Sequence, residues 1–358
     1  MKKKFIIKTL YFTSPFAILY IVTLLFYTSK NGDLARLGYI PNKYRDYENN
    51  LASDRPEKFE LLSETKNKNF KIITLGDSFS ELGNQGYKNV LAVDYNFSIL
   101  HVDRFITINQ ITQANQIQTL IDMINGGFFD KYHVEYVILE KAERIITLGL
   151  DDIDFSKKLT LNQLDSLIVN HHKPTKDNQD KFFSAATIKF PLYHFPRFYL
   201  SKNYLSNKQV YNVELNTKSL FGNHSNKLLF YYDDIETLNY SNSIENAEKL
   251  NKYLIKINEM LQKKNIKLIV LPAPDKYDFY YNYISDKKQY PKPIFFDNMK
   301  KQKKDYIYID SKEILSKHLK DKQDIYYWDD THWSPIGSKI VGDEVAKAIL
   351  QNEAEKNR

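Results

Sequence analysis

The 358-residue chain contains no cysteine. This absence excludes disulfide bonds, thiolate nucleophiles and cysteine-ligated zinc sites, and it is compatible with an oxidising compartment without demonstrating one. Glycine-rich nucleotide-binding patterns and calcium loops are missing as well. Eight histidines are present, but His171-His172 lies in a polar stretch without carboxylates at ligand spacing. We therefore expect no metal and no cofactor.

Long apolar runs are rare. The mean hydropathy is −0.51, and a single segment approaches the length of a membrane span. The net charge of +7 comes from lysines scattered along the chain. This pattern is typical of a solvated surface near an anionic membrane, and no nucleic-acid-binding signature accompanies it. We expect no nucleic-acid partner.

The one long apolar segment runs from Leu10 to Tyr27 and carries no formal charge. It is roughly 18 residues long, near the lower limit for a membrane-spanning helix, and such a helix tolerates Pro15. A cleaved signal peptide would have an apolar region of roughly 7–15 residues ending in a small-x-small site. No such site lies between Tyr27 and Asp33, so residues 1–30 are predicted to be an uncleaved anchor.

Lysines precede this segment at positions 2, 3, 4 and 8. By the positive-inside rule they stay in the cytoplasm. The chain is thus predicted to cross the inner (cytoplasmic) membrane once, with the N-terminus cytoplasmic and everything after Lys30 periplasmic or extracellular.

The rest of the chain is predicted to form one domain. Residues 31–69 are polar and predict a juxtamembrane connector with little structure of its own, followed by a domain at 70–351. Buried strands alternate with amphipathic helices, so we expect an α/β fold with a mostly parallel sheet covered on both faces. Strands are predicted at Phe70–Leu75, Phe97–Val102, Val134–Leu139, Lys267–Leu271 and Tyr306–Ile309, and helices at Gln110–Ile124, 243–261 and from Pro335 onward.

Regular periodicity fails at about 145–240, where the sequence is polar, aromatic and interrupted by prolines. A bare loop of this length is uncommon in a compact domain. We interpret the segment as an insertion over one end of the sheet, with short helices and a hairpin.

The string Gly76-Asp77-Ser78-Phe79-Ser80 follows the first predicted strand. Ser78 is a candidate nucleophile, because a helix beginning just after it would offer N–H donors where negative charge develops. Gly76 allows a tight turn, whereas Asp77 and Ser80 are interpreted as capping residues. The carboxyl ends of parallel strands meet at one edge of a sheet, so the site is expected there.

A matching base lies near the other end of the chain, in Asp330-Thr331-His332-Trp333. His332 would take the Ser78 proton and return it to the leaving group. Asp330 and Asp329 lie two and three positions before it, and either could orient the imidazole. The three residue types predict serine hydrolysis or acyl transfer.

Together these strings resemble the SGNH hydrolase superfamily. Asp330 to Ser334, followed by Gly337, more closely resembles the SGNH-like domain of the alginate O-acetyltransferase group (AlgX and AlgJ). In that group the orienting aspartate lies two residues before the histidine, which implies Asp330. The segment Leu271–Tyr277 resembles the group's Pro-x-x-Lys segment, and Glu140 to Arg144 resembles its Glu-Arg pair. The resemblance implies a flavodoxin-like three-layer sandwich and covers roughly 70–145 and 245–350.

The sequence departs from the superfamily in its oxyanion donors, because the expected glycine and asparagine are not clearly placed. Possible oxyanion or substrate contacts are Gly76, Asp77, Arg144, Lys276, Tyr277 and Trp333. For two of these residues a structural role is favoured over a contact with substrate: Arg144 as an ion-pair partner of Glu140, and Tyr277 as a packed aromatic. Lys276 could equally hold a loop.

The resemblance implies transfer of an acetyl group to a polysaccharide hydroxyl. It also implies a membrane-bound O-acyltransferase as the partner that supplies the acetyl group. Two alternatives remain open: an esterase or polysaccharide deacetylase that uses the same residues with water, and a non-catalytic glycan-binding or assembly protein.

Overall fold

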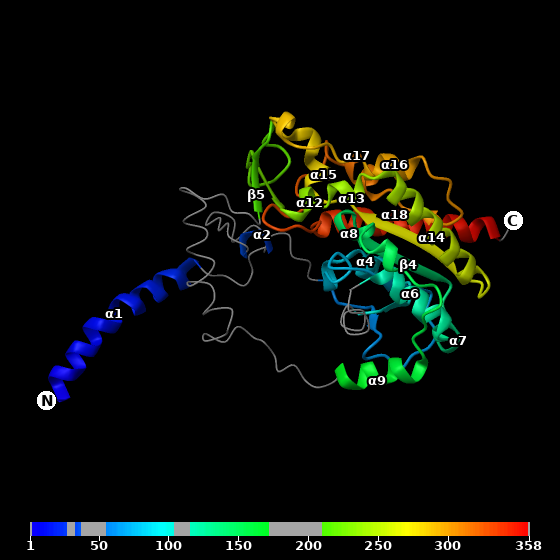
Figure 1. Cartoon of the computed structure of the whole chain (residues 1–358), viewed down its shortest axis with the longest axis horizontal. Coiled ribbons are helices and arrows are strands. Elements are labelled where there is room, and N and C mark those ends of the chain that lie inside the picture. The colour runs from blue at the N-terminus through cyan, green and yellow to red at the C-terminus, as the bar shows by residue number, and fades with distance from the viewer. Residues whose placement is uncertain (1, 27–32, 37–54, 104–114, 172–209, 357–358) are drawn as a thin grey trace.

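A parallel sheet of six strands forms the centre of the molecule (Figure 1). The computed structural model describes residues 2–26, 33–36, 55–103, 115–171 and 210–356. All neighbouring strands in the sheet run parallel, which requires crossovers and accounts for the alternation of strands with helices. In spatial order the strands are β1 (Glu60–Leu61), β3 (Ile99–His101), β2 (Ile72–Leu75), β4 (Tyr136–Ala142), β7 (Lys267–Ala273) and β8 (Ile307–Tyr308). The predicted α/β class is confirmed.

Two apolar layers cover the two faces of the sheet. Successive strand side chains point to opposite faces, so Ile72 packs in one layer and Ile73 in the other. Ile72 shares its layer with apolar residues of α4 (Tyr87–Asp94), α17 (Ser311–Lys317) and α18 (Pro335–Lys356). Ile73 shares its layer with residues of α6 (Gln116–Asn125), α14 (Ile244–Gln262) and α16 (Phe295–Lys300). The helices therefore lie on both faces, as Figure 1 shows for α4, α6, α14 and α18.

Side-chain caps set several helix starts. The Ser243 side chain accepts from the backbone N–H of Asn246 at the start of α14. Asp310 caps α17 in the same way. The predicted helix at 110–124 is observed as α6, and its first residues lie outside those described.

Two short parts of the predicted connector belong to the folded unit, so the expectation of little structure there is wrong for them. β1 extends the sheet by pairing with β3, and α2 (Asp33–Arg36) packs against the C-terminal part of the chain. The domain boundaries as a whole stay a prediction.

The described part of the 145–240 segment contains the predicted short helices and hairpin. The hairpin joins β5 (Val210–Glu214) to β6 (Lys227–Tyr231) in antiparallel pairing. Residues 172–209 lie outside the described part. The short helices are the end of α8 (Glu143–Ile146), η2 (Leu150–Asp152), α9 (Leu161–His171), α12 (Asp233–Glu236) and α13 (Leu238–Ser241). Further short helices of the described residues are η1 (Gly83–Gln85), α7 (Phe128–Lys131), α15 (Lys276–Tyr280), η4 (Tyr281–Tyr283) and η5 (Lys287–Gln289).

Near the N-terminus, α1 (Lys2–Phe26) contains Pro15. Its segment Lys2–Ile21 is the one helix of the described chain that is long and apolar enough to cross a membrane. This is consistent with the predicted single-pass anchor, although a signal sequence meets the same test. The orientation and the identity of the membrane stay predictions.

Candidate active site

The predicted functional residues gather at one edge of the sheet. Ser78 follows β2, Arg144 follows β4 and Lys276 follows β7. Because these strands are parallel neighbours, their carboxyl ends present the three residues along the same edge, as expected for an open α/β sheet.

Ser78 lies in a turn that two side-chain contacts of Asp77 hold in place. The Asp77 carboxylate accepts from the backbone N–H of Phe79 at 3.0 Å and from that of Ala142 at 2.7 Å. The Asp77 backbone N–H donates to the Glu140 carboxylate at 3.1 Å. The predicted capping role of Asp77 is thus confirmed, whereas its N–H is already engaged and is not aimed at an oxyanion.

Glu140 lies beneath the turn. It is fully buried, so its carboxylate requires hydrogen-bond partners within the protein. Ser80 Oγ donates to it at 2.8 Å. A Cβ on Gly76 would lie 2.0 Å from Ser80 Oγ and 2.4 Å from Glu140 Oε2. Glycine is required at this position because the two side chains approach its backbone too closely for a Cβ. Burial and the charge of Asp77 raise the pKa of Glu140 well above its usual range.

The sequence allows a helix or a loop to begin after Ser78, and the loop is observed. Residues 78–80 form a turn, in which the Glu81 N–H donates to the Ser78 carbonyl. The first longer helix, α4, begins only at Tyr87. The Asp77 side chain accepts the Phe79 N–H within this turn.

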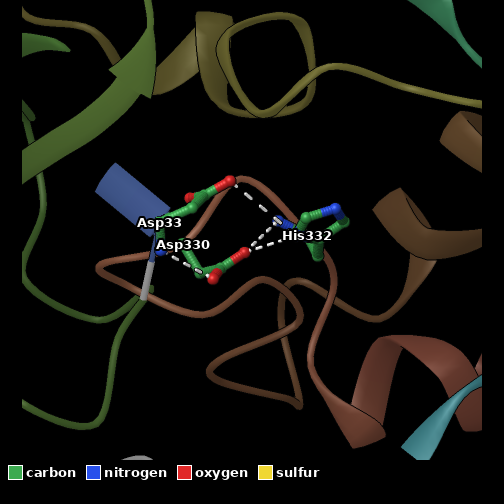
Figure 2. Close-up of side chains that lie close together, drawn as sticks. All are labelled: Asp33, Asp330 and His332. Carbon is green, nitrogen blue, oxygen red and sulfur yellow. Dashed lines mark hydrogen bonds and ion pairs between the residues drawn. The ribbon is translucent and has the colours of Figure 1, made fainter. Parts of the chain in front are cut away.

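His332 contacts both of its predicted partners. Its Nε2 lies 2.7 Å from Ser78 Oγ, and its Nδ1 lies 2.5 Å from Asp330 Oδ1. Asp330 Oδ1 also accepts from the His332 backbone N–H at 3.0 Å. Figure 2 shows the carboxylate of Asp330 facing the imidazole. Of the two candidate orienters, it is Asp330 that contacts the ring, while the Asp329 carbonyl accepts from Leu34.

This arrangement favours a basic imidazole. A carboxylate can only accept, so the His332 Nδ1–H donates to Asp330 and leaves Nε2 as the acceptor for the Ser78 hydroxyl. Burial pulls the pKa of His332 down, but the charge and hydrogen bond of Asp330 outweigh it and raise this pKa above its ordinary value. Against the effect of burial, His332 holds the pKa of Asp330 well below its usual range.

Aromatic side chains support the imidazole from behind. The Phe79 ring lies 4.8 Å from the His332 ring, and the Trp333 ring lies 4.8 Å from Phe79. Trp333 is fully buried. Its suggested role as a substrate contact is therefore wrong, and it acts through packing.

Tyr277 is a packed aromatic, the structural alternative from the sequence. It is fully buried, its ring lies 4.9 Å from that of Phe230, and its hydroxyl donates to the Pro291 carbonyl at 2.5 Å. Because the side chain is fully buried, the suggested substrate contact is wrong.

Arg144 has other partners than the predicted one. Its guanidinium lies 2.5 Å from Asp275 and 3.4 Å from Asp234, so the interpretation as an ion pair with Glu140 is wrong. The arginine charge acts to lower the pKa of His332. A role in charge stabilisation stays a prediction.

Lys276 holds the loop that carries His332. It is fully buried, and its Nζ donates to the carbonyls of Trp328 at 2.6 Å and Asp330 at 3.1 Å. Burial lowers the pKa of Lys276 to about 8, although the neighbouring aspartates oppose this. The loop-holding alternative from the sequence is the one observed.

Replacing Lys276 by methionine should therefore affect stability and activity together. The change leaves two buried carbonyls without their donor, which costs about 1–3 kcal/mol of unfolding free energy. Displacement of Asp330 should lower kcat about 10- to 100-fold with little change in KM. Chemical unfolding and ester hydrolysis measure the two effects, with the exposed Lys263→Met as the matched control. Full kcat in a destabilised Lys276→Met protein would contradict the link to the catalytic loop.

Sequence reasoning missed Asp33, which reaches the same site from α2. Its backbone N–H donates to Asp330 Oδ2 at 2.9 Å, and its carboxylate lies 4.0 Å from His332 Nδ1, as Figure 2 shows. In the described part of the chain, Asp33, Asp330 and His332 form the one group of three side chains close enough to hold a metal. Hydrogen bonds within the protein already engage the ligand atoms of the two aspartates, which does not favour a metal there.

The fold and the contacts define an SGNH-like α/β domain with a serine, a histidine and an aspartate in contact. Residues 226–358 match the model of the family described as "SGNH hydrolase-like domain, acetyltransferase AlgX". The resemblance found from the motifs is thereby confirmed, and an acetyltransferase-related function is indicated. The matched region contains His332, Asp330 and Lys276, whereas Ser78 precedes it. Comparisons with curated proteins and with solved structures gave no match.

Proposed function

We propose that this chain is a membrane-anchored, extracytoplasmic O-acetyltransferase that modifies a polysaccharide. The observation that carries the proposal is the Ser78–His332–Asp330 contact series in a domain that resembles an acetyltransferase domain. The apolar helix α1 supports anchoring.

In the first half-reaction Ser78 Oγ attacks the carbonyl carbon of an acetyl donor. The serine proton passes to His332 Nε2. The tetrahedral intermediate then collapses, the bond from the carbonyl carbon to the donor group breaks, and the donor group leaves with the proton from His332. The product is an acetyl ester on Ser78.

In the second half-reaction a polysaccharide hydroxyl gives its proton to His332 and attacks the acetyl carbonyl. Collapse breaks the bond to Ser78 Oγ, which takes the proton back. Asp330 stays ionised and stabilises the imidazolium in both halves. The described residues contain one candidate span, so a separate membrane-bound O-acyltransferase is proposed as the source of the acetyl group.

A second candidate function is an esterase or polysaccharide deacetylase. The contact between Ser78 and His332 serves water as the second nucleophile equally well. The choice therefore depends on the acceptor, and the geometry of the described residues is neutral between the two.

The deciding experiment follows the acetyl group. The full chain in detergent is incubated with 4-nitrophenyl acetate, with and without polysaccharide oligomers, and the products are analysed by mass spectrometry. Acetylated oligomers that disappear in Ser78→Ala would support transfer. Release of acetate alone, again dependent on Ser78, would support the esterase. Equal background in folded wild-type and variant proteins would contradict both.

A further inference from the structure

Hydrogen bonds join the short helix α2 to the loop that carries His332. The Asp33 carboxylate accepts from the Thr331 backbone N–H at 2.9 Å and from the Thr331 hydroxyl at 2.6 Å. The Leu34 backbone N–H donates to the Asp329 carbonyl at 3.1 Å. Leu34 is fully buried in the same apolar cluster as Trp328, so this segment is fixed by packing as well as by hydrogen bonds.

Asp33 also completes the surroundings of the orienting carboxylate. Asp330 Oδ1 accepts from His332, and Asp330 Oδ2 accepts from the Asp33 backbone N–H at 2.9 Å. With both oxygens engaged, the carboxylate is held in one orientation toward the imidazole (Figure 2). A carboxylate fixed in this way stays in the rotamer that orients the imidazole for proton transfer.

The contact brings two carboxylates together, which costs energy. Burial and the charge of Asp330 raise the pKa of Asp33. The charge of His332 and the hydrogen bonds from Thr331 oppose that rise by stabilising the charged form of Asp33. A surface aspartate near the start of a connector would avoid this cost by staying in water, so the placement of Asp33 here indicates a role in the site.

We infer that Asp33 is a positioning residue that aligns Asp330 and His332 for proton transfer to and from Ser78. The inference rests on the proposed function and deepens it. The segment that supplies Asp33 begins seven residues after Phe26, the last residue of α1. Seven residues span at most about 25 Å, so the catalytic base is assembled within that reach of the anchor helix.

Several charges act on Asp33 and His332. Together they determine in which direction Asp33 shifts the pKa of His332. Asp330 and Asp33 raise the pKa of His332, whereas burial and Arg144 on α8 lower it. Asp33 in turn acts on Asp234 of α12 and on Lys276 of α15. Removing the Asp33 charge should lower the pKa of His332, so the neutral base persists to lower pH.

Two variants of the full chain in detergent test the inference. Asp33→Asn removes the charge and keeps one acceptor, and Asp33→Ala removes both accepted hydrogen bonds. Both should shift the NMR titration midpoint of the His332 imidazole, and the acid limb of kcat for ester hydrolysis, to lower pH. Asp33→Ala should also lower kcat about 10- to 100-fold with little change in KM. The exposed Glu248→Gln is the charge-removal control and should leave both readouts unchanged.

An unchanged His332 titration and an unchanged kcat in Asp33→Asn and Asp33→Ala would overturn the inference. Loss of wild-type activity on chelation, restored by Zn²⁺, would also overturn it by making Asp33 a metal ligand. If Asp33→Ala does not fold, the titration in Asp33→Asn decides. If Ser78→Ala retains full activity, the proposed function fails, while the His332 titration still decides the role of Asp33.

Discussion

Replacing Ser78 by alanine should lower kcat for ester hydrolysis and for acetyl transfer by about 10⁴- to 10⁶-fold. The imidazole then has no hydroxyl to activate, and no acyl-enzyme can form. His332 and Asp330 remain bonded to each other, so the fold and the imidazole environment should survive. Steady-state kinetics give the loss in kcat. Intact-protein mass spectrometry shows whether the acetyl adduct on the wild-type chain disappears.

The control for this change is Ser316→Ala, an exposed serine of α17, which should keep full activity. The thermal unfolding midpoint of Ser78→Ala should equal that of the wild-type chain, because the Asp77 contacts that hold the turn remain. Persistent activity in a folded Ser78→Ala protein would require another nucleophile and would contradict the assigned chemistry.

The strands and the contacts among Ser78, His332 and Asp330 were predictable because their signals are local or follow from topology. Asp330 and His332 are two residues apart, so their contact needs only a suitable loop. Ser78 and His332 are far apart in sequence, but a parallel sheet brings the carboxyl ends of its strands to one edge. These two facts were sufficient to predict which side chains meet.

The contacts that were missed or wrong depend on packing that has no local pattern. Asp33 lies 297 residues before Asp330, and its polar surroundings resemble those of any exposed connector. Glu140 and Arg144 suggested an ion pair by proximity alone. In the fold Glu140 faces the Ser78 turn, whereas Arg144 lies beyond the strand and faces Asp275 at the end of β7.

The orienting role of Asp330 gives the sharpest comparison, because Asp329 beside it serves as a matched control. Asp330→Asn preserves shape but places an amide donor opposite His332 Nδ1. Imidazole then accepts at Nδ1 and carries its proton on Nε2, where it can no longer accept from Ser78. We expect a loss in kcat of about 10⁴-fold.

The control variant Asp329→Asn makes no change at the imidazole, so its kcat should stay within about tenfold of the wild-type value. Kinetics across pH 6–9, together with ¹⁵N NMR of the imidazole tautomer, measure both effects. Equal losses in the two variants, or a larger loss in Asp329→Asn, would show that the contact between Asp330 and His332 does not set the tautomer of the base.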